Sequence, residues 1–146
     1  MGLEIEYKYL VKNTNFKAMA ESSLRIRQGY LSRNPERVVR VRTKGDRGYL
    51  TVKGKNHGAS RLEFEYEIPF EDAEKMLSLC EGQLLDKIRY LVPYEGHVWE
   101  VDEFLGNRLG LVTAEIELES EDTPFSIPDF IGENVTGNPA YYNSNL

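Results

Sequence analysis

Eight stretches of this 146-residue chain alternate between apolar and polar residues with a period of two. They cover residues 3–11, 24–32, 37–44, 48–55, 61–69, 84–93, 97–104 and 112–119. Side chains of a β-strand alternate between its two faces, so each stretch is predicted to be a strand with one apolar and one polar face. Several connecting segments, such as SRNPE and PYEGH, are short and rich in turn-forming residues, which favours antiparallel pairing of neighbours.

Eight antiparallel strands fit a closed or nearly closed barrel, and a sandwich of two sheets is the alternative. Apolar residues at helical spacing predict one helix at about residues 71–80, and weaker patterns indicate two more near 16–21 and 128–132. The expected fold class is therefore α+β but mainly β: an eight-stranded antiparallel closed barrel with a few flanking helices. No linker or repeat divides the chain, so we expect a single domain over residues 1–146.

The composition, with 40% hydrophobic and 29% charged residues, is that of a folded soluble protein. A net charge of -6 argues against general binding of nucleic acid or of anionic membranes, but it allows a local basic pocket. No apolar run approaches 18 residues and no signal-peptide pattern is present, so no membrane association is expected. The single cysteine, Cys80, excludes an internal disulfide and is typical of a cytoplasmic protein.

The polar faces of the predicted strands carry charged residues almost exclusively. Acidic residues dominate this face at 3–11, 61–69, 97–104 and 112–119, whereas Lys and Arg dominate it at 37–44, 48–55 and 84–93. A solvated surface is the usual explanation for one such strand. Like charges two residues apart repel one another, however, and grouped carboxylates suit divalent cations while grouped Arg and Lys suit phosphate. The alternation alone does not say which face points into the barrel.

The charged motifs occur in a characteristic order, which resembles that of the triphosphate tunnel metalloenzyme family, also called CYTH domains. This resemblance implies an eight-stranded barrel with its charged faces turned inward and its apolar faces outward, under helices. It also implies metal-dependent hydrolysis of a small linear triphosphate, most simply inorganic tripolyphosphate. The motifs are EIEYK at 4–8, RQGYL at 27–31, RVR at 40–42, LTVK at 50–53, RLEFE at 61–65, KIR at 87–89, EVD at 100–102, EIE at 115–117 and a closing VTG followed by YYN.

The same resemblance implies roles for individual residues. The phosphate-binding residues would be Lys8, Arg40, Arg42, Lys53, Arg61, Lys87 and Arg89. The ligands of Mg²⁺ or Mn²⁺ would be Glu4, Glu6, Glu63, Asp102, Glu115 and Glu117. Lys87 and Tyr30 would orient or deprotonate the attacking water. All these metal ligands are oxygens, and no His or Cys cluster accompanies them, so a hard cation is expected and zinc is not.

Other functions remain open within the same fold: a class IV type adenylate cyclase, a thiamine triphosphatase, or a non-catalytic polyphosphate-binding module. The expected helices are too few to cover the outward apolar residues, so we expect a homodimer that buries some of them. Residues 137–142 contain no Lys or Arg, whereas members of the resembled family often carry basic residues there. We therefore expect the closing segment to supply one phosphate contact fewer.

Overall fold

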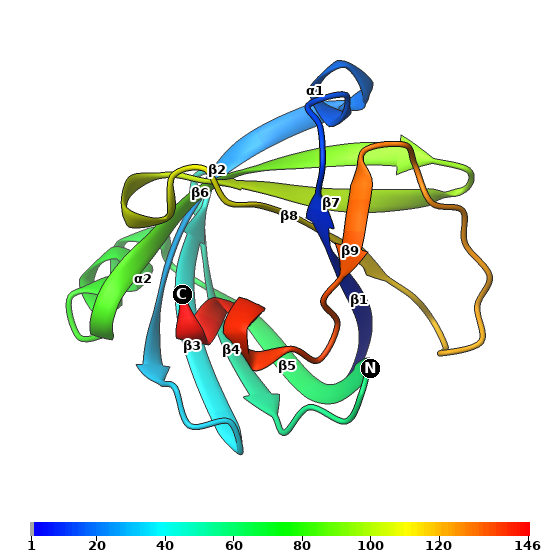
Figure 1. Cartoon of the computed structure of the whole chain (residues 1–146). Coiled ribbons are helices and arrows are strands. Elements are labelled where there is room, and N and C mark those ends of the chain that lie inside the picture. Colours follow the sequence, from blue (N-terminus) through cyan, green and yellow to red (C-terminus); the bar gives the residue numbers. More distant parts are fainter. Residues whose placement is uncertain (1) are drawn as a thin grey trace.

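The computed structural model describes residues 2–146, and nine strands form one antiparallel sheet in it. The order of neighbours is β5-β4-β3-β2-β6-β7-β8-β1-β9, and an additional pairing of β5 with β1 closes the first eight into a barrel (Figure 1). The eight-stranded closed barrel expected from the sequence is confirmed, with β9 as one further strand. The strands are β1 (Leu3–Val11), β2 (Ser22–Ser32), β3 (Arg37–Lys44), β4 (Arg47–Gly54), β5 (Ser60–Ile68), β6 (Glu81–Tyr94), β7 (His97–Phe104), β8 (Val112–Glu117) and β9 (Ile131–Asn134).

Tight turns join most neighbouring strands, as the antiparallel pairing requires. Between β6 and β7, Glu95 and Gly96 both have positive φ angles, 49° and 83°. Positive φ at both central residues is the signature of a type I′ turn, whose twist matches that of the two strands. This local geometry sets the β6–β7 register, in which Arg89 lies opposite Asp102.

Two short α-helices and three 3₁₀ turns accompany the barrel. They are α1 (Phe16–Met19), α2 (Phe70–Leu77), η1 (Gly106–Arg108), η2 (Pro139–Tyr141) and η3 (Asn143–Asn145). The helix predicted at 71–80 is confirmed as α2, and the one near 16–21 is a single turn, α1. The prediction of a helix near 128–132 is wrong, because this segment enters β9, where Ile131 pairs with Val11. The edge of β1 beyond its short contact with β5 is free to accept this strand.

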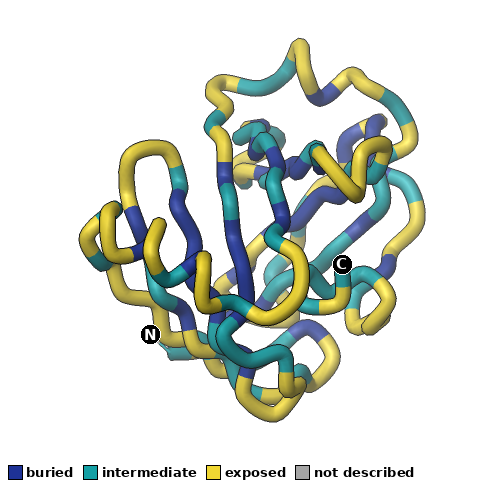
Figure 2. Tube along the Cα trace, turned by 90° about the vertical axis from the view of Figure 1, so that its left-hand side faces the viewer, coloured by how far each residue is buried: buried dark blue, intermediate teal, exposed yellow. Residues whose placement is uncertain are grey.

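The apolar core lies outside the barrel, between the strands and the segments that cross them. Ile5, Trp99 and Ile116 pack there with Phe16 of α1 and with Phe130, and all five are buried. Residues of both faces are buried in the middle of β3 and of β8, at 40–43 and 113–116, and Figure 2 shows buried stretches of this kind along the strands. No helix among residues 2–146 is long and apolar enough to cross a bilayer.

The inner face is charged but is not uniform. Tyr30, Val38, Leu85 and Phe104 form a separate apolar cluster, and Leu146 packs against it. The C-terminal segment therefore reaches the barrel, and Figure 1 shows it lying across the barrel beside β3 and β4. The remainder of the inner face carries the ionisable residues described next.

Candidate functional site

The inner faces of the strands enclose a cavity of about 240 Å³. Seven glutamates, five basic residues and Asn143 line it. A barrel of this size normally fills its interior with apolar side chains, because buried charges are costly unless they are paired. The inward orientation of the charged faces, which the sequence left open and the resemblance implied, is therefore what the structure has.

Six of the carboxylates form two groups of three, and within each group the oxygens lie within 4.8 Å of one another. Glu4 and Glu6 are successive inward residues of β1, and they belong to different groups although Glu6 lies opposite Glu117 of the first group. One group consists of Glu4, Glu63 and Glu117, and the other of Glu6, Glu100 and Glu115. Five of the six expected metal ligands belong to these groups.

Burial and neighbouring carboxylates raise the pKa values of two glutamates in the acidic groups. Burial, followed by repulsion from Glu115 and Glu4, raises the pKa of Glu6 well above its ordinary value. Burial and neighbouring carboxylates raise the pKa of Glu117 to about 7. Glu115 is the exception: burial raises its pKa, but Lys8, whose Nζ lies 3.4 Å from it, together with a hydrogen bond from Glu6 and the charges of Arg89 and Lys87, holds its pKa well below the usual range.

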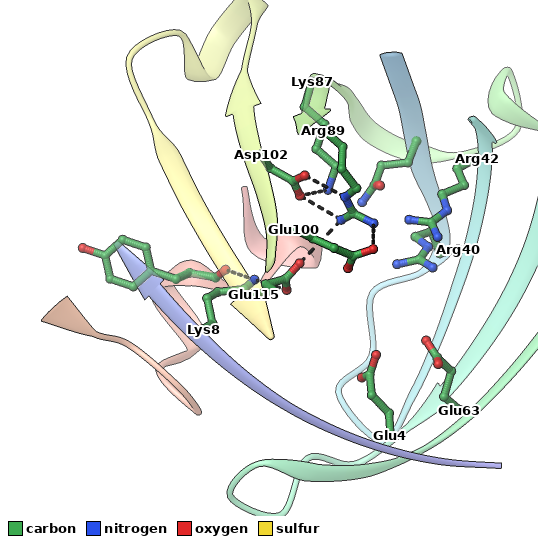
Figure 3. Close-up of polar contacts among 12 residues, drawn as sticks. Glu4, Lys8, Arg40, Arg42, Glu63, Lys87, Arg89, Glu100, Asp102 and Glu115 are labelled. Atoms are coloured by element: carbon green, nitrogen blue, oxygen red, sulfur yellow. Dashed lines mark hydrogen bonds and ion pairs between the residues drawn. The ribbon is translucent and has the colours of Figure 1, made fainter. Parts of the chain in front are cut away.

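Asp102, the sixth expected metal ligand, lies outside both groups of three in the part of the chain that the structure describes. Arg89 donates to its two oxygens at 2.8 and 2.9 Å, and the Nζ atom of Lys87 lies 2.8 Å from Oδ2 (Figure 3). These cations outweigh burial and hold the pKa of Asp102 well below its usual range. Its contacts are therefore those of a residue that holds two bases in place.

Sequence reasoning did not assign a role to Glu100, which belongs to the second acidic group. Glu100 and Asp102 are two residues apart on the same face of β7, so the alternating pattern predicts the same orientation for both. Their pairing separates them: Asp102 lies opposite Thr113 of β8, and Glu100 lies opposite Glu115. No signal in the sequence gives this pairing, because it depends on the register between strands.

The basic residues gather mainly on β3 and β6. Arg40 and Arg42 each direct Nη2 to Glu65, at 3.3 and 3.4 Å. Lys53 lies between the carboxylates of Glu4 and Glu63, with Nζ 3.1 and 3.3 Å from them. Glu65 therefore connects Arg40 with Arg42 on the basic wall, which is formed by the inward Arg and Lys residues of β3 and β6, and Lys53 connects two members of the first acidic group.

Arg61 is placed differently from the other expected phosphate-binding residues. Its Nε and Nη2 donate to the carbonyl oxygen of Gly54 at 3.1 and 2.9 Å. The guanidinium therefore secures the end of β4, directly after Lys53, through two of its nitrogen atoms.

Three buried donors of the basic wall have no hydrogen-bond acceptor among residues 2–146: Arg40 Nε, Arg42 Nε and Lys87 Nζ. Lys87 is nevertheless paired in charge, since its Nζ atom lies 2.8 Å from Asp102 Oδ2. Burial lowers the pKa of Lys87 to about 8, and burial together with Arg40 and Arg89 lowers that of Arg42 to about 10. Unpaired buried donors are rare and costly, and an anion with several oxygens would satisfy them.

Tyr30 is buried at the edge of this wall. Gln28 Nε2 donates to its hydroxyl at 3.0 Å, and the Arg33 guanidinium lies over its ring at 4.9 Å from the centroid. No hydrogen bond joins Tyr30 to Lys87 in the described residues. Both residues are near Phe104, whose ring centroid is 5.4 Å from Lys87 Nζ and which shares the apolar cluster of Tyr30. A direct pairing of Tyr30 with Lys87 stays a prediction.

The C-terminal segment contributes backbone carbonyls to the site. Lys8 Nζ donates to the carbonyl oxygen of Tyr141 at 3.0 Å, and Arg33 donates to that of Ser144. A second cavity of about 70 Å³ lies between this segment and the inner residues of β1. The segment therefore orients cations of the barrel, although it carries none of its own.

A closed antiparallel barrel with inward carboxylates facing inward Arg and Lys defines a class of proteins that hold polyanions and cations in a charged tunnel. The CYTH domain model matches residues 2–142, so this chain belongs to the CYTH domain family. The resemblance drawn from the order of its motifs is thereby confirmed.

Two curated relatives are named inorganic triphosphatases. The protein from Acetivibrio thermocellus is 52% identical over 100% of this chain and 94% of its own length. The protein from Nitrosomonas europaea is 34% identical over 98% and 95%. A solved structure of an inorganic triphosphatase superposes with a TM-score of 0.69 at 31% identity, covering 97% of this chain and 92% of that one.

Proposed function

We propose that this protein is a metal-dependent triphosphatase that hydrolyses a small linear triphosphate, with inorganic tripolyphosphate as the preferred substrate. The observation that carries the proposal is the pair of buried donors without an acceptor, Nε of Arg40 and Nε of Arg42, on residues that line one cavity together with two groups of carboxylates. The names of the curated relatives support the same reaction.

The basic wall would bind the phosphate oxygens. Arg40, Arg42 and Arg89 offer planar, two-pronged donors, whereas Lys8 and Lys53 offer compact charges that already neutralise the acidic groups. Arg61 acts through Gly54 by holding the end of β4 next to Lys53. We therefore assign Arg61 a supporting role.

The two acidic groups fit Mg²⁺ or Mn²⁺. Their ligand atoms are all carboxylate oxygens, which hard divalent cations prefer. Burial and then repulsion between carboxylates raise the pKa values of Glu6 and Glu117, and a bound cation would offset both effects. When bound, such a cation would neutralise part of the negative charge on the phosphates. The ligands would be Glu4, Glu63 and Glu117 in one group and Glu6, Glu100 and Glu115 in the other.

Lys87 is the proposed general base, and Tyr30 a residue that orients the attacking water. A lysine pKa of about 8 leaves part of the population neutral at mildly alkaline pH, as proton abstraction requires. Asp102 contacts both Lys87 and Arg89 and fixes their positions. We propose this positioning role for Asp102 in place of metal binding. Hydrolysis would yield orthophosphate and pyrophosphate.

We also propose that a second copy of the chain covers part of the outer face. Ile5, Trp99 and Ile116 are covered by the chain's own segments, but other outward residues are not. The exposed apolar side chains on β1, β4 and β5 carry roughly 400–500 Å² of accessible surface, comparable with the apolar share of one side of a standard interface. They are Leu3, Val52, Leu62, Phe64 and Tyr66.

Light scattering at micromolar concentration tests this association. Phe64→Glu should convert the dimer to a monomer, because it introduces a charge at the centre of the patch. Leu109→Glu is a matched control, since Leu109 is exposed elsewhere. A wild-type monomer would contradict the proposal.

A phosphate-release panel tests the enzymatic function. Tripolyphosphate, ATP, thiamine triphosphate and pyrophosphate are each supplied with Mg²⁺, Mn²⁺ or EDTA. Release from tripolyphosphate that is lost in EDTA is the expected result. Cyclic AMP formed from ATP would indicate a cyclase instead, and tripolyphosphate binding without release from any substrate would indicate a non-catalytic module.

A further inference from the structure

Gln28 is a fully buried polar residue on the inner face of the barrel. Its Nε2 donates to the hydroxyl of Tyr30 at 3.0 Å, whereas its Oε1 is buried and has no hydrogen-bond partner in residues 2–146. Buried amide oxygens are normally paired, because leaving one unpaired carries a penalty in folding free energy. Gln28 therefore presents an acceptor that the folded chain does not use.

The backbone holds Gln28 in this position. A Cβ atom on the following residue, Gly29, would lie 2.6 Å from Leu84 Cδ2 and 2.7 Å from Cys80 Sγ. Only glycine lets β2 approach the outer layer this closely, and the register with β6 shifts directly after Gln28. The orientation of Gln28 and Tyr30 is thus determined by packing on the far side of the strand.

The chemistry of the surroundings limits what Oε1 can bind. Gln28 lies opposite Arg42 of β3, on the side of the barrel that carries the basic wall. A phosphate oxygen is itself an acceptor and cannot donate to Oε1. The two carboxylate groups that suit a divalent cation are formed by β1, β5, β7 and β8, and Figure 3 shows Glu4 and Glu63 across the cavity from Lys87 and Arg42. A water molecule remains, because it can donate to Oε1. Tyr30, whose hydroxyl the same amide holds, lines the smaller cavity together with Arg40.

We propose that Gln28 Oε1 binds the water that attacks the terminal phosphorus, while Nε2 of the same amide fixes Tyr30. This inference rests on the proposed triphosphatase function. The water oxygen forms the new P–O bond as the bridging P–O bond breaks. The electron pair of the broken bond leaves with pyrophosphate. One water proton stays on orthophosphate and the other reaches the departing pyrophosphate, so atoms and charge balance.

Gln28→Met tests the role, because it keeps the length of the side chain and removes both hydrogen-bonding groups. We expect kcat for tripolyphosphate to fall roughly 100-fold, as for a misplaced reacting group, with little change in KM. Gln83→Met is the matched control, since Gln83 is an exposed glutamine of the neighbouring strand β6. An unchanged kcat in Gln28→Met would overturn the proposal.

A double-mutant cycle separates water binding from an effect through Tyr30. If Oε1 binds the water, Gln28→Met lowers kcat by at least about tenfold also in a Tyr30→Phe background, where the amide has no hydroxyl to hold. If Gln28 acts only by positioning Tyr30, the second substitution costs nothing further, and the proposal fails.

Gln28→Glu covers the case in which Gln28→Met does not fold. The carboxylate keeps an acceptor at this position. In the Tyr30→Phe background, the Gln28→Glu variant should therefore have a higher kcat than the Gln28→Met variant. If the Gln28→Met variant is unfolded, the Gln28→Glu variant should still have a measurable kcat in that background. A folded but inactive Gln28→Glu, Tyr30→Phe variant would contradict the inference. Absence of phosphate release by the wild-type protein would refute the proposed function itself, which distinguishes the two failures.

Discussion

Replacing Asp102 with Asn removes one buried charge and leaves two cations beside it. Asp102 is 1% exposed, and it accepts two hydrogen bonds from Arg89 and pairs with Lys87. Loss of one partner from a buried ion pair costs about 3–5 kcal/mol of unfolding free energy. Since the Asn carbonyl can still accept one bond from Arg89, we take about 3 kcal/mol, which corresponds to a fall in Tm of roughly 10 °C for a chain of this size.

The same variant should bind Mn²⁺ as the wild type does, because Asp102 lies outside both acidic groups among the described residues. Thermal melting at pH 7.5 measures the loss of stability, and calorimetric titration measures the affinity for Mn²⁺. Glu4→Gln is the positive control for metal binding, with an affinity lowered by more than about tenfold.

Asp86→Asn is the matched control for stability. Asp86 also forms a two-pronged pair with an arginine, Arg25, but this pair is exposed and should contribute little. If Asp102→Asn weakened Mn²⁺ binding as strongly as Glu4→Gln, Asp102 would be a metal ligand and the reasoning from its contacts would be refuted. An unchanged Tm would equally refute the assigned cost of the broken pair.

Three further outcomes are expected. Glu6→Gln should abolish metal-dependent phosphate release while the circular dichroism spectrum stays that of the wild type, whereas Glu133→Gln, at an exposed site on β9, should keep full activity. Because the pKa of Lys87 is lowered to about 8, the fraction of neutral lysine increases as the pH rises towards that value. The ratio kcat/KM should therefore rise from pH 6.5 and level off above about 8. A flat profile would exclude Lys87 as the base. Because the pKa of Glu117 is raised to about 7, protons compete with the cation below that pH, so Mn²⁺ affinity measured by calorimetry should fall by up to about tenfold per pH unit; constant affinity from pH 5.5 to 8 would argue against this ligand.

The strands could be predicted because their signal is local. Alternation located β1, β3 and β7 with the bounds that the structure has, since one face of each is apolar wherever the strand lies. The segment near 128–132 shows the limit of such reasoning. Its apolar residues fit a short helix equally well, and only the free edge of β1 makes it a strand.

The outer surface shows a similar limit. Ile5, Trp99 and Ile116 point outward as the alternation requires, but the chain itself covers them with α1 and the segment around Phe130. Counting helices therefore overestimated the exposed apolar surface. Five of the large apolar residues that stay exposed lie together on β1, β4 and β5, in the patch that includes Phe64 and Tyr66.

The sequence by itself determined the number of barrel strands, the segregation of acidic from basic faces and, through the order of its motifs, the family. Tertiary structure alone decided which charges meet: Glu100 joins an acidic group, Asp102 pairs with Arg89 and Lys87, and Gln28 is left with an unused acceptor. The physical reason is that alternation specifies the face on which a side chain lies, whereas its partners depend on the register and closure of the barrel. Those are set by turns, bulges and packing between residues far apart in the chain.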